Sequence, residues 1–136
     1  MKTVLCNGCF DPLHYGHVLH LAYAQGFGDR LIVAMTRDSA VTREKGKGRP
    51  FLDETRRGTC LMMIKGVEDV FLCDNALEAL KTLKPDVFVK GKDYAEGVGK
   101  EIEDYCKANG IEIKFTTTDK YSSTELIDEL RRRSES

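Results

Sequence analysis

Two histidines, His14 and His17, lie where an apolar segment of the chain gives way to a helical pattern. Residues 3–6 predict a buried strand and residues 18–27 predict a helix, with Gly8 in the turn between them. The free backbone N–H groups and the dipole of a helix N-terminus both favour negative charge. Imidazolium groups there can neutralise charge that develops on a phosphate during displacement. The segment therefore predicts a phosphate-binding catalytic site.

The histidines could also bind a metal or serve only in packing. His14, His17 and His20 are spaced by three residues and would share a helix face, as metal ligands can. No glutamate accompanies them, and His20 lies within the apolar part of the helix, where a packing role is expected. Phe10 and Asp11 complete the turn before the histidines, and this wider frame favours the phosphate site.

Composition excludes several classes of protein. The 136 residues carry a net charge of −1 without a long basic block, so no nucleic-acid partner is expected. No apolar stretch reaches the length of a membrane span, and the N-terminus has no signal-peptide pattern, so we expect no membrane association. The five cysteines are an odd number, and they lack the two paired motifs of a four-cysteine metal site. Reduced, mostly buried thiols in a cytoplasmic protein are therefore expected, and Cys9, in the turn, is the one open to oxidation.

Strand-like and helix-like segments alternate along the chain. Strands are expected at residues 3–6, 30–35, 70–73, 86–89 and 111–115, and helices at 18–27, 53–66, 76–83, 100–108 and 122–132. This alternation predicts one domain over residues 1–136 with an α/β fold: a Rossmann-like, doubly wound five-stranded parallel sheet with helices on both faces. Ligands of such sheets bind beyond the carboxyl ends of the strands, where the strand order reverses.

The segment after the second strand, residues 37–49, is basic and contains two glycines. Its composition predicts a flexible loop that closes on a triphosphate, with Lys45 as a phosphate ligand, although a charge run is also typical of a solvated surface. Arg56 and Arg57 follow at the start of the next helix, where positive charge opposes the helix dipole. At least one of these arginines is therefore expected to serve a ligand.

Two later segments also fall at the carboxyl edge of the predicted sheet. Residues 90–94 place Gly91 where the backbone can approach a ligand closely, and Asp93 and Tyr94 could contact sugar hydroxyls or a base. Residues 122–125 match a helix capping box, whose hydroxyls and free N–H groups could also hold phosphates.

Six motifs in order resemble the nucleotidyltransferase superfamily, whose catalytic fold is shared with class I aminoacyl-tRNA synthetases. They are Asn-Gly-Cys-Phe-Asp (7–11), His-x-Gly-His (14–17), Gly-Asp-x-Leu-Ile-Val-Ala (28–34), Lys-Gly-x-x-Arg-Pro (45–50), Val-Lys-Gly-x-Asp-Tyr (89–94) and Ser-Ser-Thr (122–124). Within it, the chain most resembles the adenylyltransferase domain of bacterial heptose 1-phosphate enzymes, and glycerol-3-phosphate cytidylyltransferases are near neighbours. Lys92, Tyr121 and Thr55 depart from the usual pattern and leave the acceptor open.

The resemblance implies a set of site residues. His14, His17, Lys45 and Arg57 would form the catalytic group, and Asp11 would either help through a metal or fix the turn. The nucleotide would contact Cys9, Phe10, Asp11, His14, His17, Lys45, Gly91, Asp93, Ser122, Ser123 and Thr124. The acceptor would contact Lys90, Lys92 and Tyr94.

The implied reaction joins the nucleoside monophosphate of an NTP to a phosphomonoester and releases pyrophosphate. The resemblance favours ATP with heptose 1-phosphate, a divalent cation such as Mg²⁺ on the triphosphate, and a cytoplasmic homodimer. Cytidylyl transfer to glycerol 3-phosphate or another small phosphomonoester is the alternative within enzymes. A nucleotide sensor on the same fold and a flavodoxin-like electron carrier are the alternatives outside them. The two histidines disfavour the sensor, and the absence of tryptophan and of a hydroxyl-rich first loop disfavours the carrier.

Overall fold

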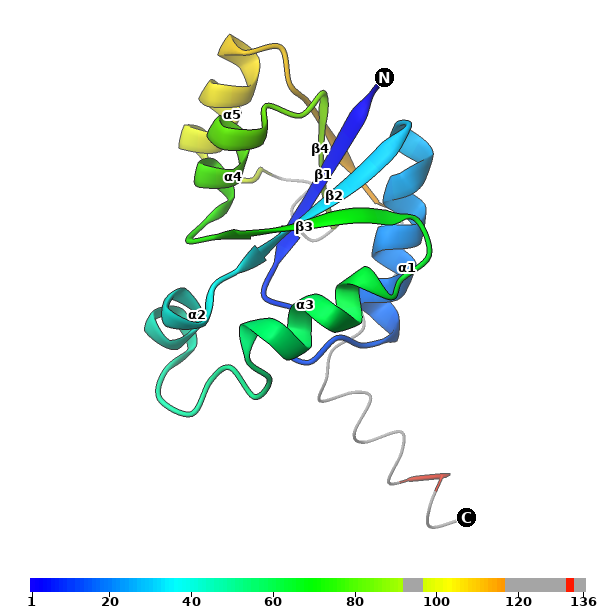
Figure 1. Ribbon diagram of the computed structural model, residues 1–136. Helices are drawn as coiled ribbons and strands as arrows, with labels where there is room; N and C mark the ends of the chain where they lie inside the picture. The colour runs from blue at the N-terminus through cyan, green and yellow to red at the C-terminus, as the bar shows by residue number, and fades with distance from the viewer. Residues whose placement is uncertain (92–96, 117–131, 134–136) are drawn as a thin grey trace.

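The five strands of the computed structural model form one parallel sheet. The structure describes residues 1–91, 97–116 and 132–133 (Figure 1). The strands are β1 (Thr3–Gly8), β2 (Arg30–Thr36), β3 (Val67–Cys73), β4 (Val87–Lys90) and β5 (Glu112–Phe115), and their order in the sheet is β3-β2-β1-β4-β5. All four neighbouring pairs are parallel. The predicted doubly wound α/β fold is confirmed.

Helices cover both faces of this sheet, because the three inner strands, β1, β2 and β4, are apolar on both sides. On one face, α1 (Tyr15–Ala24) and α3 (Glu54–Met62) contribute Leu21 and Leu61 to a core with Val33 of β2. On the other face, α4 (Ala76–Leu83) and α5 (Lys100–Ala108) pack Leu80 and Cys106 against the sheet. The remaining elements are α2 (Asp38–Lys45) and a short 3-10 turn, Gln25–Phe27.

The main correction to the predicted elements concerns residues 37–49, which we expected to be a flexible loop. Asp38–Lys45 instead forms α2, which ends at Gly46, a residue with a φ of 98°. Asp38 favours the helix N-terminus, and the basic residues near its end favour the C-terminus. The helix is anchored because Ala40 and Val41 are buried. Two apolar residues among many charged ones give no clear helical pattern, so the sequence did not predict this helix.

Several element boundaries also differ from the prediction. The first helix begins at Tyr15 rather than residue 18, and α3 ends at Met62, before the predicted end near Gly66. β3 begins at Val67, three residues before the predicted start. The prediction missed its first residues because Glu68 and Asp69 are exposed and interrupt the apolar pattern. The predicted helix at 122–132 and its capping box lie outside the described residues, apart from Arg132.

Buried thiols account for three of the five cysteines. Cys6, Cys73 and Cys106 are buried, Cys9 is half-buried and Cys60 is exposed, and none of the five is in a disulfide. Burial raises the pKa of the Cys6 thiol to about 12 and, with the nearby charge of Glu78, that of Cys73 to about 11. These thiols are therefore inert core groups. In the described part of the chain, no helix is long and apolar enough to cross a membrane.

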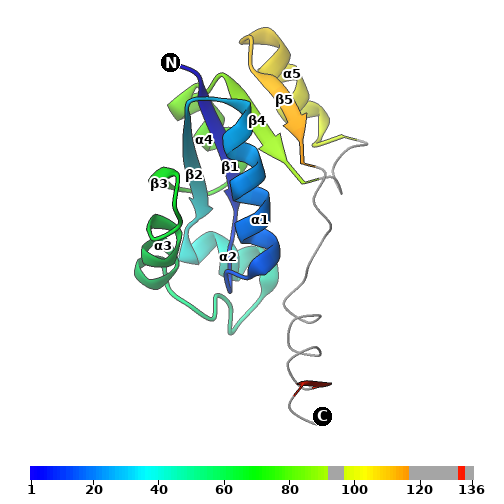
Figure 2. The same cartoon turned by 90° about the vertical axis from the view of Figure 1, so that its right-hand side faces the viewer.

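The strand order reverses beside β1, the central strand. The chain proceeds from β1 outward to β2 and β3, and then crosses to β4 on the other side of β1 (Figure 2). At such a reversal, the helices that follow neighbouring strands leave in opposite directions and open a crevice at the carboxyl edge. In this sheet the reversal lies between β1 and β4, beside the turn that carries the two histidines.

Candidate active site

The two histidines cap the helix on which they lie. His14 is the N-cap residue of α1, and its Nδ1 accepts a hydrogen bond of 3.1 Å from the backbone N–H of Gly16. The Nδ1 of His17 accepts one of 3.3 Å from the backbone N–H of His14. This is a reciprocal capping box made by two imidazoles instead of the usual hydroxyl and carboxylate. The rings stack with their centroids 3.9 Å apart.

The capping box fixes the tautomer of both rings. An imidazole nitrogen that accepts a hydrogen bond carries no proton, so in a neutral ring the proton lies on the other nitrogen. Both Nδ1 atoms accept from the backbone, so the neutral forms of His14 and His17 carry their protons on Nε2. The start of the helix therefore holds two imidazoles that can donate through Nε2–H, an arrangement suited to an oxyanion.

His17 is neutral at pH 7, contrary to the imidazolium expected from the sequence. Burial is the main cause, and the nearby charges of His14, His20 and Lys45 add to it, so that the pKa of His17 falls to about 4. A neutral ring still donates through Nε2. An incoming polyanion would raise this pKa, because negative charge favours the protonated ring.

The low pKa of His17 predicts a pH-dependent stability. The folded pKa lies below the ordinary value of 6.5, so the unfolded chain binds the proton more readily. The contribution of neutral His17 to the free energy of unfolding should be fully present above about pH 6.5 and be lost as the pH falls towards about 4. Urea unfolding of the wild type and His17→Asn across this range should show a difference that shrinks on acidification. A constant difference would contradict the prediction.

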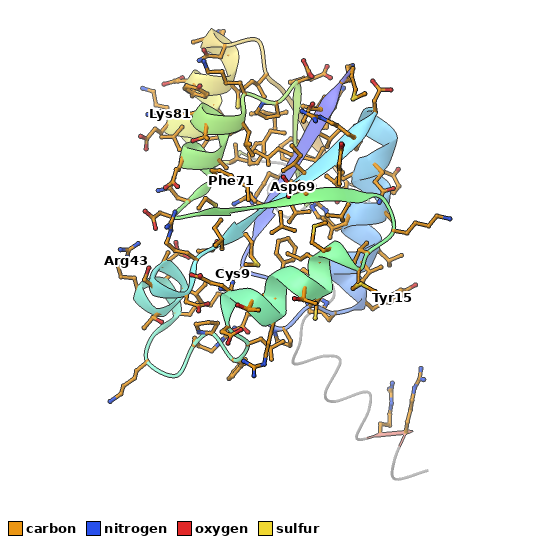
Figure 3. The ribbon with its side chains drawn as sticks, viewed as in Figure 1. Cys9, Tyr15, Arg43, Asp69, Phe71 and Lys81 are labelled. Carbon is orange, nitrogen blue, oxygen red and sulfur yellow. The ribbon has the colours of Figure 1, made fainter. Side chains whose placement is uncertain are left out.

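Phe10 shapes the turn between β1 and α1. Its backbone has a φ of 53°, and its ring is buried edge-on against His17, with ring centroids 5.1 Å apart. Gly8 leaves room for that ring, because a Cβ at Gly8 would lie 3.1 Å from the Phe10 ring. Figure 3 shows Cys9 at this turn, near α2 and α3, with Arg43 on the outer side of α2. The Phe10 ring thus packs against the His17 ring and restricts its orientation.

Asp11 fixes the turn. Its Oδ2 accepts hydrogen bonds from the Phe51 backbone N–H (2.7 Å) and Arg49 Nε (3.0 Å), and its Oδ1 accepts one from the Leu52 N–H (2.9 Å). Burial acts to raise the pKa of Asp11, but these hydrogen bonds outweigh it and the net pKa is lowered. The side chain is fully buried among donors. Of the two roles left open by the sequence, this geometry supports the structural one and not metal ligation.

Arg57, expected to hold a phosphate, lies beneath the turn instead. Its side chain is fully buried, and its guanidinium donates to the carbonyl oxygens of Cys9 and Thr36 and to the carboxylate of Asp38. Arg56 pairs with Asp53, the N-cap residue of α3, at 2.6 Å. Each arginine therefore has a carboxylate that offsets the unfavourable helix dipole. The helix dipole therefore does not require a ligand at either arginine, and Arg57 is occupied by the protein itself.

The ends of β4 and β5 lie at the same edge of the sheet as the turn. Lys90 Nζ donates to Asn7 Oδ1 at 2.9 Å, which joins the carboxyl ends of β4 and β1. Burial lowers the pKa of Lys90. A Cβ at Gly91 would meet open space, as the predicted close approach of a ligand requires. Two residues at this edge were not among the predicted site residues: Asn7, which begins the first motif, and Thr116, whose hydroxyl lies 3.0 Å from His20 Nδ1.

Lys45 is the last residue of α2, and its side chain is exposed. Its positive charge contributes to the lowered pKa of His17, so it lies on the histidine side of the molecule. The structure thus brings together the turn, both histidines, Lys45, Lys90 and Gly91. Lys92, Asp93, Tyr94, Ser122, Ser123 and Thr124 lie outside the described residues. No cluster of three metal-binding side chains occurs in the ranges that are described.

A doubly wound sheet with a helix N-terminus at its reversal point is an architecture in which α/β proteins bind nucleotides, and the paired Nε2–H donors suit phosphoryl chemistry. The cytidylyltransferase-like family matches residues 5–129, and the chain belongs to this family of nucleotidyltransferases.

Individual relatives agree with this membership. The bifunctional protein HldE of Citrifermentans bemidjiense is 40% identical over 134 residues, which are 95% of this chain and 27% of that protein. HldE of Pseudomonas fluorescens is 43% identical and is matched by 98% of this chain over 28% of its own length. The chain thus spans about a quarter of these curated relatives. A solved lipopolysaccharide core biosynthesis protein from Thermoplasma volcanium is 31% identical, with a TM-score of 0.70 over 90% of this chain and 99% of that one.

Proposed function

We propose that the chain transfers the adenylyl group of ATP to a sugar 1-phosphate, with heptose 1-phosphate as the acceptor, and releases pyrophosphate. The capping box of His14 and His17 carries this proposal, because it places both imidazoles at the helix N-terminus after the first strand, where a nucleotide phosphate binds in such sheets. The choice of adenylyl group and acceptor is supported by the motif resemblance and by the HldE relatives. Cytidylyl transfer to glycerol 3-phosphate is the alternative.

The chemistry requires little beyond positioning and charge stabilisation. An oxygen of the acceptor phosphate, already ionised at pH 7, forms a bond to the α-phosphorus, and the bond from that phosphorus to the bridging oxygen breaks. The bonding electrons leave with pyrophosphate. His14 and His17 would donate to oxygens on which charge develops, and Lys45 would hold the outer phosphates. Neither a general base nor a covalent intermediate is needed.

The proposal includes Mg²⁺ carried by the triphosphate. The described residues provide no cage of carboxylates, and Asp11 is saturated with N–H donors. Mg²⁺ commonly binds through substrate phosphates and water in such sites. A cytoplasmic homodimer is also part of the proposal. Exposed apolar side chains on α1 and at the end of α3, such as Tyr15, Tyr23 and Met63, support it. Light scattering coupled to size exclusion would measure the mass in solution.

A pyrophosphate-release matrix tests the reaction. ATP and CTP would each be combined with heptose 1-phosphate and glycerol 3-phosphate in the presence of Mg²⁺. We expect the highest kcat/KM for ATP with heptose 1-phosphate. A higher value for CTP with the best acceptor would favour the cytidylyl alternative. Absence of pyrophosphate with every pair, in protein that binds ATP, would favour the nucleotide sensor.

Lys45→Ala is expected to raise the KM for ATP and leave the melting temperature nearly unchanged. The side chain is exposed at the end of α2, so its loss should alter stability by no more than about 0.5 kcal/mol. Lys47→Ala is the matched control, since Lys47 is also exposed and lies two residues along the chain. Steady-state kinetics with ATP varied would measure the effect. Equal KM values for the two variants would remove Lys45 from the site.

A further inference from the structure

Arg57 joins three segments of the chain that meet beneath the phosphate turn. Its Nη1 donates to the Cys9 carbonyl at 2.9 Å and to the Thr36 carbonyl at 2.7 Å, and its Nη2 donates to Asp38 Oδ1 at 2.5 Å. Those acceptors belong to the turn after β1, the end of β2 and the start of α2. A guanidinium with no exposed side-chain surface is tolerable only when partners like these surround it.

The bond to the Cys9 carbonyl determines which way the next N–H points. In a planar trans peptide the C=O and the N–H of one unit point in opposite directions. The Cys9 carbonyl points at Arg57, so the N–H of Phe10 points away from the buried guanidinium. Within the described ranges no acceptor is hydrogen-bonded to that N–H. Backbone donors are rarely left without a partner, so this one is placed for a ligand or water.

Asp38 holds Arg57 and also couples it to α2. Its second carboxylate oxygen accepts from the Glu54 backbone N–H at 3.2 Å, and its own backbone N–H donates to Glu54 Oε1 at 2.7 Å. The starts of α2 and α3 are thereby tied together. Because Asp38 begins the helix that ends at Lys45, the same carboxylate connects the turn to the helix that presents Lys45.

We propose that Arg57 and Asp38 are positioning residues that hold the Cys9–Phe10 peptide so that the Phe10 N–H donates to a phosphate of the bound nucleotide. This proposal rests on the function proposed above. Neither side chain touches the substrate. Lysine at position 57 would keep the charge but could not reach two carbonyls and a carboxylate together, because an ammonium lacks the planar fork of a guanidinium.

Three substitutions test this proposal by kinetics. Arg57→Lys should lower kcat/KM for ATP by about 10²-fold, the order expected when a donor is misplaced by about 1 Å, and leave the acceptor KM unchanged. Asp38→Asn, a mild change at a partly exposed side chain, should give a loss in the same direction, and the double variant should lose little more than Arg57→Lys. Arg56→Lys is the matched control, because Arg56 is the neighbouring arginine and also pairs with an aspartate, but is exposed. Its kcat/KM for ATP should match that of the wild type.

Stability and amide resonances separate positioning from simple unfolding. Kinetics would be compared at a temperature where melting curves show every variant fully folded, and a loss of kcat/KM that is absent at that temperature would overturn the proposal. In ¹⁵N–¹H spectra, ATP alone should shift the Phe10 amide of the wild type and of Arg56→Lys, and shift it much less in Asp38→Asn. A Phe10 amide that ignores ATP while other site resonances respond would also overturn it. ATP-dependent shifts without any pyrophosphate release would reject the reaction and leave the positioning role standing.

Discussion

Replacement of His17 by alanine is expected to lower kcat by roughly 10²–10³-fold while the protein remains folded. The substitution removes an Nε2–H donor whose orientation is set by the hydrogen bond between His17 Nδ1 and the His14 backbone. It also removes one half of the capping box, which should cost about 1 kcal/mol of stability. Pyrophosphate release under saturating substrates and a melting curve of the same sample would measure both effects.

Two further substitutions separate the donor from the cap. The amide of asparagine occupies roughly the place of Nδ1, so His17→Asn should keep the cap and lose turnover. The amide of glutamine reaches roughly the place of Nε2, so His17→Gln should recover part of the turnover and weaken the cap. His20→Ala is the control on the same helix, where the imidazole bonds to Thr116. Near wild-type turnover in His17→Asn would remove this donor from the mechanism.

Asp11→Ala is expected to lower the free energy of unfolding by about 3 kcal/mol, because it removes a buried carboxylate and leaves three partly buried donors without their acceptor. Those donors are the N–H groups of Phe51 and Leu52 and the guanidinium of Arg49, which also lies 4.3 Å from the centre of the Phe51 ring. Urea unfolding would measure the change. Asp53→Ala, which removes a helix cap at an exposed position, should cost only about 1 kcal/mol.

The same variant distinguishes the structural role of Asp11 from a role in metal binding. A structural anchor predicts lower stability with or without Mg²⁺ in the buffer. A metal ligand would instead change the Mg²⁺ concentration at half-maximal turnover and leave unfolding nearly unaffected. The lowered pKa of Asp11 also predicts a pH dependence. The contribution of Asp11 to the free energy of unfolding should be present above about pH 4 and be lost as the pH falls further.

Local patterns in the sequence predicted most of the fold. The apolar runs that became β1, β2 and β4 identified buried strands, since strands covered on both faces contain few polar residues. Asp53 was correctly predicted to cap a helix. The prediction failed for α2, where two buried residues, Ala40 and Val41, sit among charges. So few apolar residues give too little periodicity to distinguish a short helix from a loop.

Because the strand, the turn and the helix are contiguous, the amino-acid sequence was enough to predict two histidines at the start of a helix that follows a buried strand. The roles of the charged residues around them depend on contacts made in the folded protein. The acceptors of Arg57 lie 19, 21 and 48 positions away, and the donors to Asp11 lie 38 to 41 positions away. Whether a charged side chain at the carboxyl edge binds a ligand or a neighbouring segment depends on which groups the fold brings within hydrogen-bonding distance. Spacing along the chain carries no such information, so a buried positioning arginine and a phosphate ligand have the same appearance in the sequence.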